Sequence, residues 1–140
     1  MARYTKQKVR DAWRGQEVKV RAKVATGRTM WEVGLIVEGQ AKLLCAIDTG
    51  RLAASITTQA NDRGTVPTGP GARPDDVIQK PSSDREVLIG TPVEYGPYIE
   101  FGTVRNRAQP FLRPALDLAK GRTLTILEKN GRLEFKEYLQ

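Results

Sequence analysis

Histidine is absent from the 140-residue sequence, and aromatic residues make up only 6% of it. Without histidine the chain lacks the usual general base near neutral pH, the base of Ser-His and Cys-His nucleophile pairs, and the commonest metal-binding side chain. Carboxylate, lysine and tyrosine chemistry remain open. The lack of histidine therefore argues against an enzyme, without excluding one.

Cysteine is nearly absent as well, because Cys45 is the only one. A single cysteine excludes an internal disulfide, and without histidine it leaves no soft-ligand metal site. The thiol lies within the apolar run 43–47, which is typical of a buried, unreactive cysteine.

Long apolar runs are also missing. No stretch approaches the ~20 apolar residues that a transmembrane helix needs. The N-terminus is polar and basic and lacks the apolar segment of a secretory signal. We expect a protein made in a reducing cytoplasm, with no membrane partner, that stays there or enters a structure built there.

Positive charge is in excess, and it is unevenly placed along the sequence. The formal net charge is +7, and residues 1–28 alone carry nine basic and two acidic side chains. The remaining residues carry equal numbers of basic and acidic groups. The sequence therefore assigns the basic character to the first segment.

The first third of a single expected domain, 1–140, reads as helix from Thr5 to Ile47. Apolar residues recur at spacings of 4 and 7, typical of one helix face: Val9, Trp13, Val20, Val24 and Trp31. Beyond Gly27 the apolar face moves to a second stripe: Met30, Val33, Val37, Ala41 and Leu44. This shift predicts a long helix that bends near 25–27, or two helices that meet there.

The middle of the chain reads as a turn, two strands and a loop. Asp48 can cap a short turn, and residues 55–58, of which the last three are β-branched, favour a strand within the segment 48–60. Residues 61–85 are polar and rich in proline and glycine, which predicts a long mobile loop. Residues 86–90 are predicted to form a second strand, paired with the first, within a strand-and-aromatic-turn segment 86–103.

The last segment, 104–140, is predicted to begin a helix around Pro114, because proline suits a first helical turn. Its end has two interpretations. The pair Asn130-Gly131 could cap the helix, or it could turn a hairpin between 124–127 and 133–135.

One triplet suggests catalysis. Apolar residues followed by Asp48-Thr49-Gly50 are the signature of retroviral-type aspartic proteases, whose paired aspartates share a proton and need no histidine. However, the next residue is Arg51, where that family has a small residue, and a predicted helix precedes the triplet in place of strands. A carboxylate that caps a helix or turn is the simpler interpretation of Asp48.

A second hypothesis is nucleic-acid binding. Five arginines fall on one stripe of the first helix, beside the apolar stripe: Arg3, Arg10, Arg14, Arg21 and Arg28. Such a stripe can neutralise phosphates in a sequence-independent way, and it can equally face an acidic protein or only solvent. No recognition motif of a known DNA-binding class accompanies it.

Residues 94–116 contain four of the nine aromatic side chains, braced by proline and glycine. The segment has no nucleophile–base pair, and the separation of Glu94 and Glu100 cannot be inferred across the turn. We expect Tyr98, Ile99 and Phe101 to face the core rather than a neighbouring molecule, and we favour the same for Tyr95 and Phe111.

Four blocks in order carry a family resemblance: 48–52 with Ser55-Ile56, then 87–90, 95–103 and 108–116. They resemble the small neck and tail-completion proteins of tailed bacteriophages and prophages, including head–tail joining, minor tail and tail-terminator-like proteins. The family pattern has a TGxL-x-x-SI element, a V-x-IG strand, a Y-x-x-Y-x-E-FGT turn and a Q-P-FLRPAL helix start. The loop between the first two blocks has its own composition here.

The residues that match this pattern are Asp48, Thr49, Gly50, Leu52, Ser55, Ile56, Gly90, Tyr95, Tyr98, Glu100, Phe101, Gly102, Thr103, Pro110, Phe111, Leu112 and Pro114. The resemblance implies an α+β fold, in which a long N-terminal helix packs on a small antiparallel sheet. A C-terminal helix and the long mobile loop complete it.

The resemblance also implies a function. It implies a structural virion protein without catalytic activity or cofactor, made in the host bacterial cytoplasm. Copies would form a ring, with a hexamer favoured, around the DNA channel at the neck or tail terminus. Expected partners are adaptor or stopper, tail-terminator and tail-tube proteins. The arginine stripe would then line a channel crossed by DNA or dock on an acidic ring.

Overall fold

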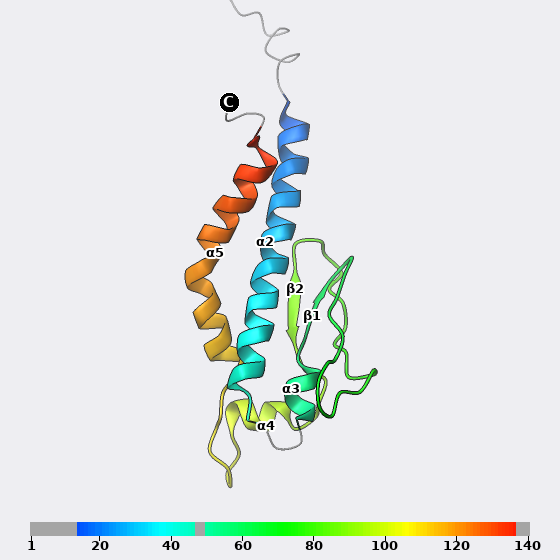
Figure 1. The fold of residues 1–140 in the computed structure, drawn as a ribbon, viewed down its shortest axis with the longest axis vertical. Helices are drawn as coiled ribbons and strands as arrows, with labels where there is room; N and C mark the ends of the chain where they lie inside the picture. The colour runs from blue at the N-terminus through cyan, green and yellow to red at the C-terminus, as the bar shows by residue number, and fades with distance from the viewer. Residues whose placement is uncertain (1–13, 47–49, 137–140) are drawn as a thin grey trace, which may run out of the picture.

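The computed structural model describes residues 14–46 and 50–136 of the chain. The order of elements is α2 (Gly15–Leu44), α3 (Arg51–Ser55), β1 (Thr57–Ala60), β2 (Val87–Gly90), α4 (Gly96–Phe101) and α5 (Leu112–Glu134). Figure 1 shows α2 in the middle, with α5 along one side and the sheet and loop 61–85 on the other. This arrangement confirms the expected α+β fold.

Helix α2 is one uninterrupted helix of 30 residues, so the alternative of two helices meeting near 25–27 is wrong. The apolar face shifts along the helix because α2 packs on two partners, α5 and the sheet. The first predicted stripe is wrong at Val20 and Val24, which are exposed, while Ala25 and Thr29 take the buried positions. The second stripe is correct at Val37 and Ala41.

The sheet has two antiparallel strands, with Thr57 opposite Gly90 and Ala60 opposite Val87. Both strands were predicted, to within two residues of their ends. Strand β1 is buried along its whole length. Its Thr58 hydroxyl donates a hydrogen bond of 3.2 Å to the carbonyl oxygen of Gly34 on α2. The close approach of sheet and helix at this point requires glycine at position 34, because a Cβ atom there would lie 2.8 Å from methyl carbons of Thr58 and Val87.

Helix α5 continues through Gly121 and Gly131, so the hairpin predicted as one possible end of the chain is wrong. Asn130 does not cap the helix either. It is fully buried against α2, where its side-chain amide donates a hydrogen bond to the Thr29 hydroxyl at 3.2 Å. Packing along α2 stabilises a helix that two glycines would otherwise weaken by about 1 kcal/mol each.

The core lies where α2, α3, the start of α5 and the segment after β2 meet. Its buried members are Val37, Ala41, Cys45, Leu52, Ile56, Val93, Phe111, Ala115 and Ala119. The predicted burial of the Cys45 thiol is therefore confirmed. In the described part of the chain, no helix is long and apolar enough to span a membrane.

Candidate functional site

The blocks that carry the family resemblance converge at one end of the fold, around α3, α4 and the start of α5 (Figure 1). The hydroxyls of Ser55 and Thr91 lie 2.6 Å apart in a hydrogen bond, which joins the end of α3 to the end of β2. At Gly96, an added Cβ atom would lie 2.8 Å from the Thr91 methyl carbon and 3.5 Å from a Leu52 methyl carbon. The first and third blocks are thus in direct contact, and Thr91, the residue that follows the second block, contacts both.

The fourth block is joined to the third by one buried carboxylate. Glu100, near the end of α4, accepts hydrogen bonds from the backbone N–H groups of Phe111, Leu112 and Arg113 at 2.7, 3.0 and 3.0 Å. These N–H groups lie at the start of α5, where a helix has no partners of its own for them. Glu100 therefore caps α5 from a distance of about ten residues in sequence.

Two opposing effects act on the pKa of Glu100. Desolvation by burial raises it, while the three backbone hydrogen bonds and the nearby Arg113 lower it, and the net result is a lowered pKa. The carboxylate is therefore ionised at neutral pH, and its charge lies at the positive end of the α5 dipole. For Cys45, desolvation and then the negative charge of Glu100 raise the pKa of the thiol, which makes it a poor nucleophile.

The turn between α4 and α5 is held by its own backbone and by Thr103. Gly102 has φ of +77°, and a Cβ atom there would lie 2.7 Å from the backbone nitrogen of Ala108. The Thr103 hydroxyl accepts the N–H groups of Arg105 and Asn106 at 3.3 and 3.0 Å. The Gly102-Thr103 pair of the motif is therefore explained by the shape of this turn.

The expected burial of the aromatic segment is correct at only one ring. Phe111 has no exposed surface, whereas Tyr98 and Phe101 are 62% and 70% exposed and Tyr95 is 38% exposed. The reason is the shortness of α4. One turn can bury only one side, and Glu100 with the half-buried Ile99 occupies it. The core interpretation of Tyr98 and Phe101 is therefore wrong.

Two open grooves flank the exposed Phe101. One, of about 430 Å³, lies between β2, α4 and the start of α5 and is mainly apolar. The other, of about 690 Å³, lies between the end of α2 and the first turns of α5. Leu44, Pro110, Pro114 and Leu118 line the second groove. This end of the molecule thus presents apolar side chains and hollows together.

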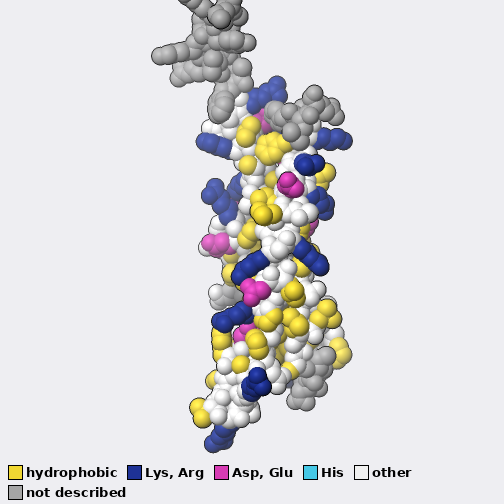
Figure 2. All heavy atoms as spheres, turned by 90° about the vertical axis from the view of Figure 1, so that its left-hand side faces the viewer, with side chains coloured by type: hydrophobic (Ala, Val, Ile, Leu, Met, Phe, Trp, Pro, Cys, Tyr) yellow, Lys and Arg dark blue, Asp and Glu magenta, His cyan; other side chains and the backbone are white. Residues whose placement is uncertain are grey.

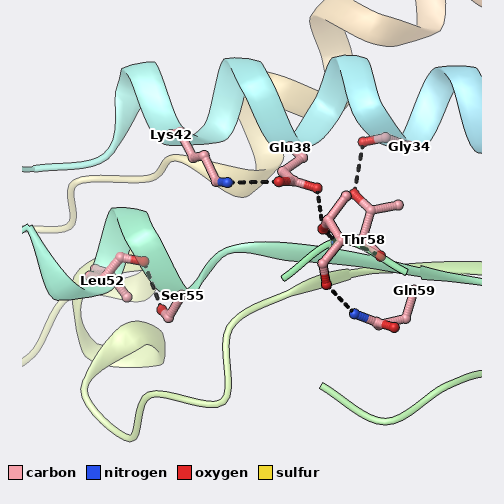
Figure 3. A network of polar contacts seen from close by, with 8 residues as sticks. Gly34, Glu38, Lys42, Leu52, Ser55, Thr58 and Gln59 are labelled. Carbon is pink, nitrogen blue, oxygen red and sulfur yellow. Dashed lines mark hydrogen bonds and ion pairs between the residues drawn. The ribbon is translucent and has the colours of Figure 1, made fainter. Parts of the chain in front are cut away.

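Loop 61–85 is attached to the rest of the fold by polar contacts. On α2, Glu38 binds Lys42 at 2.7 Å (Figure 3). Glu38 also accepts a hydrogen bond of 2.8 Å from the Thr65 hydroxyl. Farther along the loop, Asp76 accepts two hydrogen bonds of 3.0 Å from the Arg51 guanidinium. That contact lowers the pKa of Asp76 below its usual range. These two contacts connect the loop to α2 and α3. The mobility of the loop stays a prediction.

The arginine stripe is only partly visible, because Arg3 and Arg10 lie outside the described residues. Arg14 is exposed just before α2. Arg21 donates a hydrogen bond of 2.9 Å to the backbone carbonyl of Glu134, and Arg28 pairs with the Glu134 carboxylate at 2.8 Å. Both arginines therefore hold the end of α5 against α2.

The catalytic hypothesis rests on residues that the structure does not describe, since Asp48 and Thr49 lie between its two described ranges. Gly50 precedes α3 with φ of +79°, a left-handed conformation that glycine favours. Within residues 14–46 and 50–136, no group of three metal-ligating side chains comes together. Asp48 as a helix cap likewise stays a prediction.

Comparison with known proteins adds no assignment, because no family model, no curated protein and no solved structure matches the chain.

Proposed function

We propose that the chain is a structural virion protein of a tailed phage or prophage, a ring-forming subunit at the head–tail neck or the tail terminus. The observation that carries the proposal is the convergence of the four blocks into one structural unit. Gly96 and Glu100 connect the first, third and fourth blocks through direct contacts, and Thr91, which follows the second block, is hydrogen-bonded to Ser55 of the first. The four motifs that resemble the neck and tail-completion proteins thus come together in one part of the fold.

The exposed rings beside this unit support assembly. Tyr98 and Phe101 present rigid apolar area next to two grooves. Contiguous apolar surface of this kind on a folded chain marks an interaction site, and aromatic residues are enriched at such interfaces. We propose that this end contacts another copy of the chain or a neighbouring adaptor, terminator or tube protein, without a catalytic role.

The test is the content and morphology of the particles made by the strain that carries the gene. We expect mass spectrometry to find the chain in purified particles. Deletion of the gene should leave heads and tails that form separately and do not join, or tails without a finished end. Normal infectious particles from the deletion strain would refute the proposal.

A further inference from the structure

Charge that is balanced along the sequence after residue 28 is segregated in the fold. Residues 50–100, which hold the sheet and its loop, carry five basic and seven acidic side chains. Residues 101–136, which hold α5 and the turn before it, carry eight basic and three acidic side chains. The conclusion that the basic character belongs to the first segment is therefore incomplete. Figure 2 shows Lys and Arg side chains along the whole described length of the face seen from the α5 side.

Helix geometry separates the outer surface of α5 into two flanks. At about 100° per residue, Arg122, Lys129 and Arg132 fall within an arc of about 80° on one side of the buried face. We call these three residues the cationic flank. The exposed Leu116, Leu124 and Leu127 fall within an arc of about 80° on the other side. The cationic flank and these three leucines thus face different neighbours.

The cationic flank is little neutralised within the fold. Among the described residues, Arg122 and Arg132 have no carboxylate in ion-pair contact, and Lys129 lies 3.5 Å from the exposed Glu32. An exposed ion pair at such a distance contributes little. The surface therefore keeps a net positive potential.

The length and rigidity of this surface suit a phosphate backbone. Arg122 and Arg132 are about 15 Å apart along α5, a length over which one strand of a duplex carries about four phosphates. Guanidinium groups bind phosphate oxygens through paired hydrogen bonds. The contacts of Arg21 and Arg28 with Glu134 hold the helix in place, so its side chains have a fixed spacing.

We infer that the cationic flank of α5 contacts the backbone of double-stranded DNA without sequence preference. The inference rests on the proposed function, because a neck or tail-terminus ring surrounds DNA. In this proposal α5 contacts the phosphates, while Arg21 and Arg28 of α2 hold the end of α5 in position. The other flank, with Leu116, Leu124 and Leu127, remains available for contacts with neighbouring proteins. A ring subunit around DNA needs both a DNA contact and protein contacts.

The experiment measures binding of the full-length chain to a labelled, mixed-sequence duplex about two helical turns long, by fluorescence anisotropy across a salt series. The test variant is Arg122→Glu/Lys129→Glu/Arg132→Glu. The matched control is Arg73→Glu/Lys80→Glu/Arg85→Glu, which makes the same change in net charge within residues 61–85. Circular dichroism checks that both variants are folded, and Arg122→Gln/Lys129→Gln/Arg132→Gln serves if the Glu variant is not.

We expect the test variant to bind on the order of 100-fold more weakly, and its salt slope to fall by about 3, as for three lost phosphate contacts. The control variant should bind less than about 10-fold more weakly than the wild type. Equal losses in both variants, or no duplex binding by the wild type, would overturn the inference. So would binding to poly-glutamate in place of the duplex, which would assign the flank to an acidic protein. None of these results affects the particle experiment, which tests the neck role separately.

Discussion

Replacing Glu100 with glutamine is expected to lower the free energy of unfolding by about 2–4 kcal/mol. Three backbone N–H groups at the start of α5 donate to this carboxylate, and Phe111 beside it is fully buried. Glutamine keeps the shape of the side chain but loses its charge. Its amide nitrogen is a donor and cannot accept a hydrogen bond from a backbone N–H group. Charge-assisted hydrogen bonds are worth about 1.5–3 kcal/mol each, and orphaned buried donors add cost. Urea unfolding followed by circular dichroism measures the change.

The loss should depend on pH in a defined direction. The pKa of Glu100 is lowered in the folded state, so its ionised form stabilises the fold fully above the ordinary carboxyl pKa of about 4.3. That stabilisation disappears as the pH falls through the lowered folded-state pKa. The difference between wild type and Glu100→Gln should therefore be largest at neutral pH and should shrink below about pH 4.

Glu94→Gln provides the matched control for Glu100→Gln. Glu94 is an exposed glutamate six residues earlier, with no side-chain hydrogen bond or ion pair to another described residue. We expect its substitution to change stability by less than about 0.5 kcal/mol. If both substitutions have the same small effect, or if the loss at Glu100 does not vary with pH, Glu100 does not cap α5.

Replacing Gly34 with valine is expected to destabilise the fold by about 3 kcal/mol. A Cβ atom at this position would lie 2.8 Å from both the Thr58 methyl carbon and a Val87 methyl carbon. The two strands would have to move away from α2, and Thr58 would lose its hydrogen bond to the Gly34 carbonyl. Overpacking of this kind costs about 1–3 kcal/mol, and the lost hydrogen bond adds about 1 kcal/mol. Thermal unfolding measures the result.

Gly39→Val is the control for the Gly34 substitution, because Gly39 lies in the same helix with no atom within 4 Å of an added Cβ. Valine has a slightly better helix propensity than glycine, so this variant should be as stable as wild type or slightly more stable. Equal stability of the two variants would show that α2 and the sheet do not pack as closely at Gly34 as described.

Local patterns predicted most of the elements but not how long the helices run. The apolar and β-branched character of residues 55–58 and 86–90 predicted both strands. Near Gly27 the pattern predicted a bend or a junction of two helices, and at Gly131 a helix cap or a hairpin turn, yet both glycines lie inside helices. The α2–α5 contact stabilises both helices, and a pattern within either segment contains no information about the other.

The candidate site was predictable as a motif but not as a mechanism. The order of the blocks singled out Glu100, Gly102 and Thr103, but the partners of Glu100 lie more than ten residues away. For Tyr98 and Phe101, aromatic character favoured the core, while the six-residue length of α4 decided their exposure. The arginine stripe was visible in the sequence, yet its contacts with Glu134 depend on the return of α5 alongside α2.

The most direct test of the account is the double variant Tyr98→Ser/Phe101→Ser, assayed both for stability and for function. Because both rings are largely exposed, the free energy of unfolding should stay within about 1 kcal/mol of wild type. The same variant should fail to restore joined particles when supplied to the deletion strain. Marked destabilisation would instead place the rings in the core, and full complementation by a stable variant would contradict their proposed role in assembly.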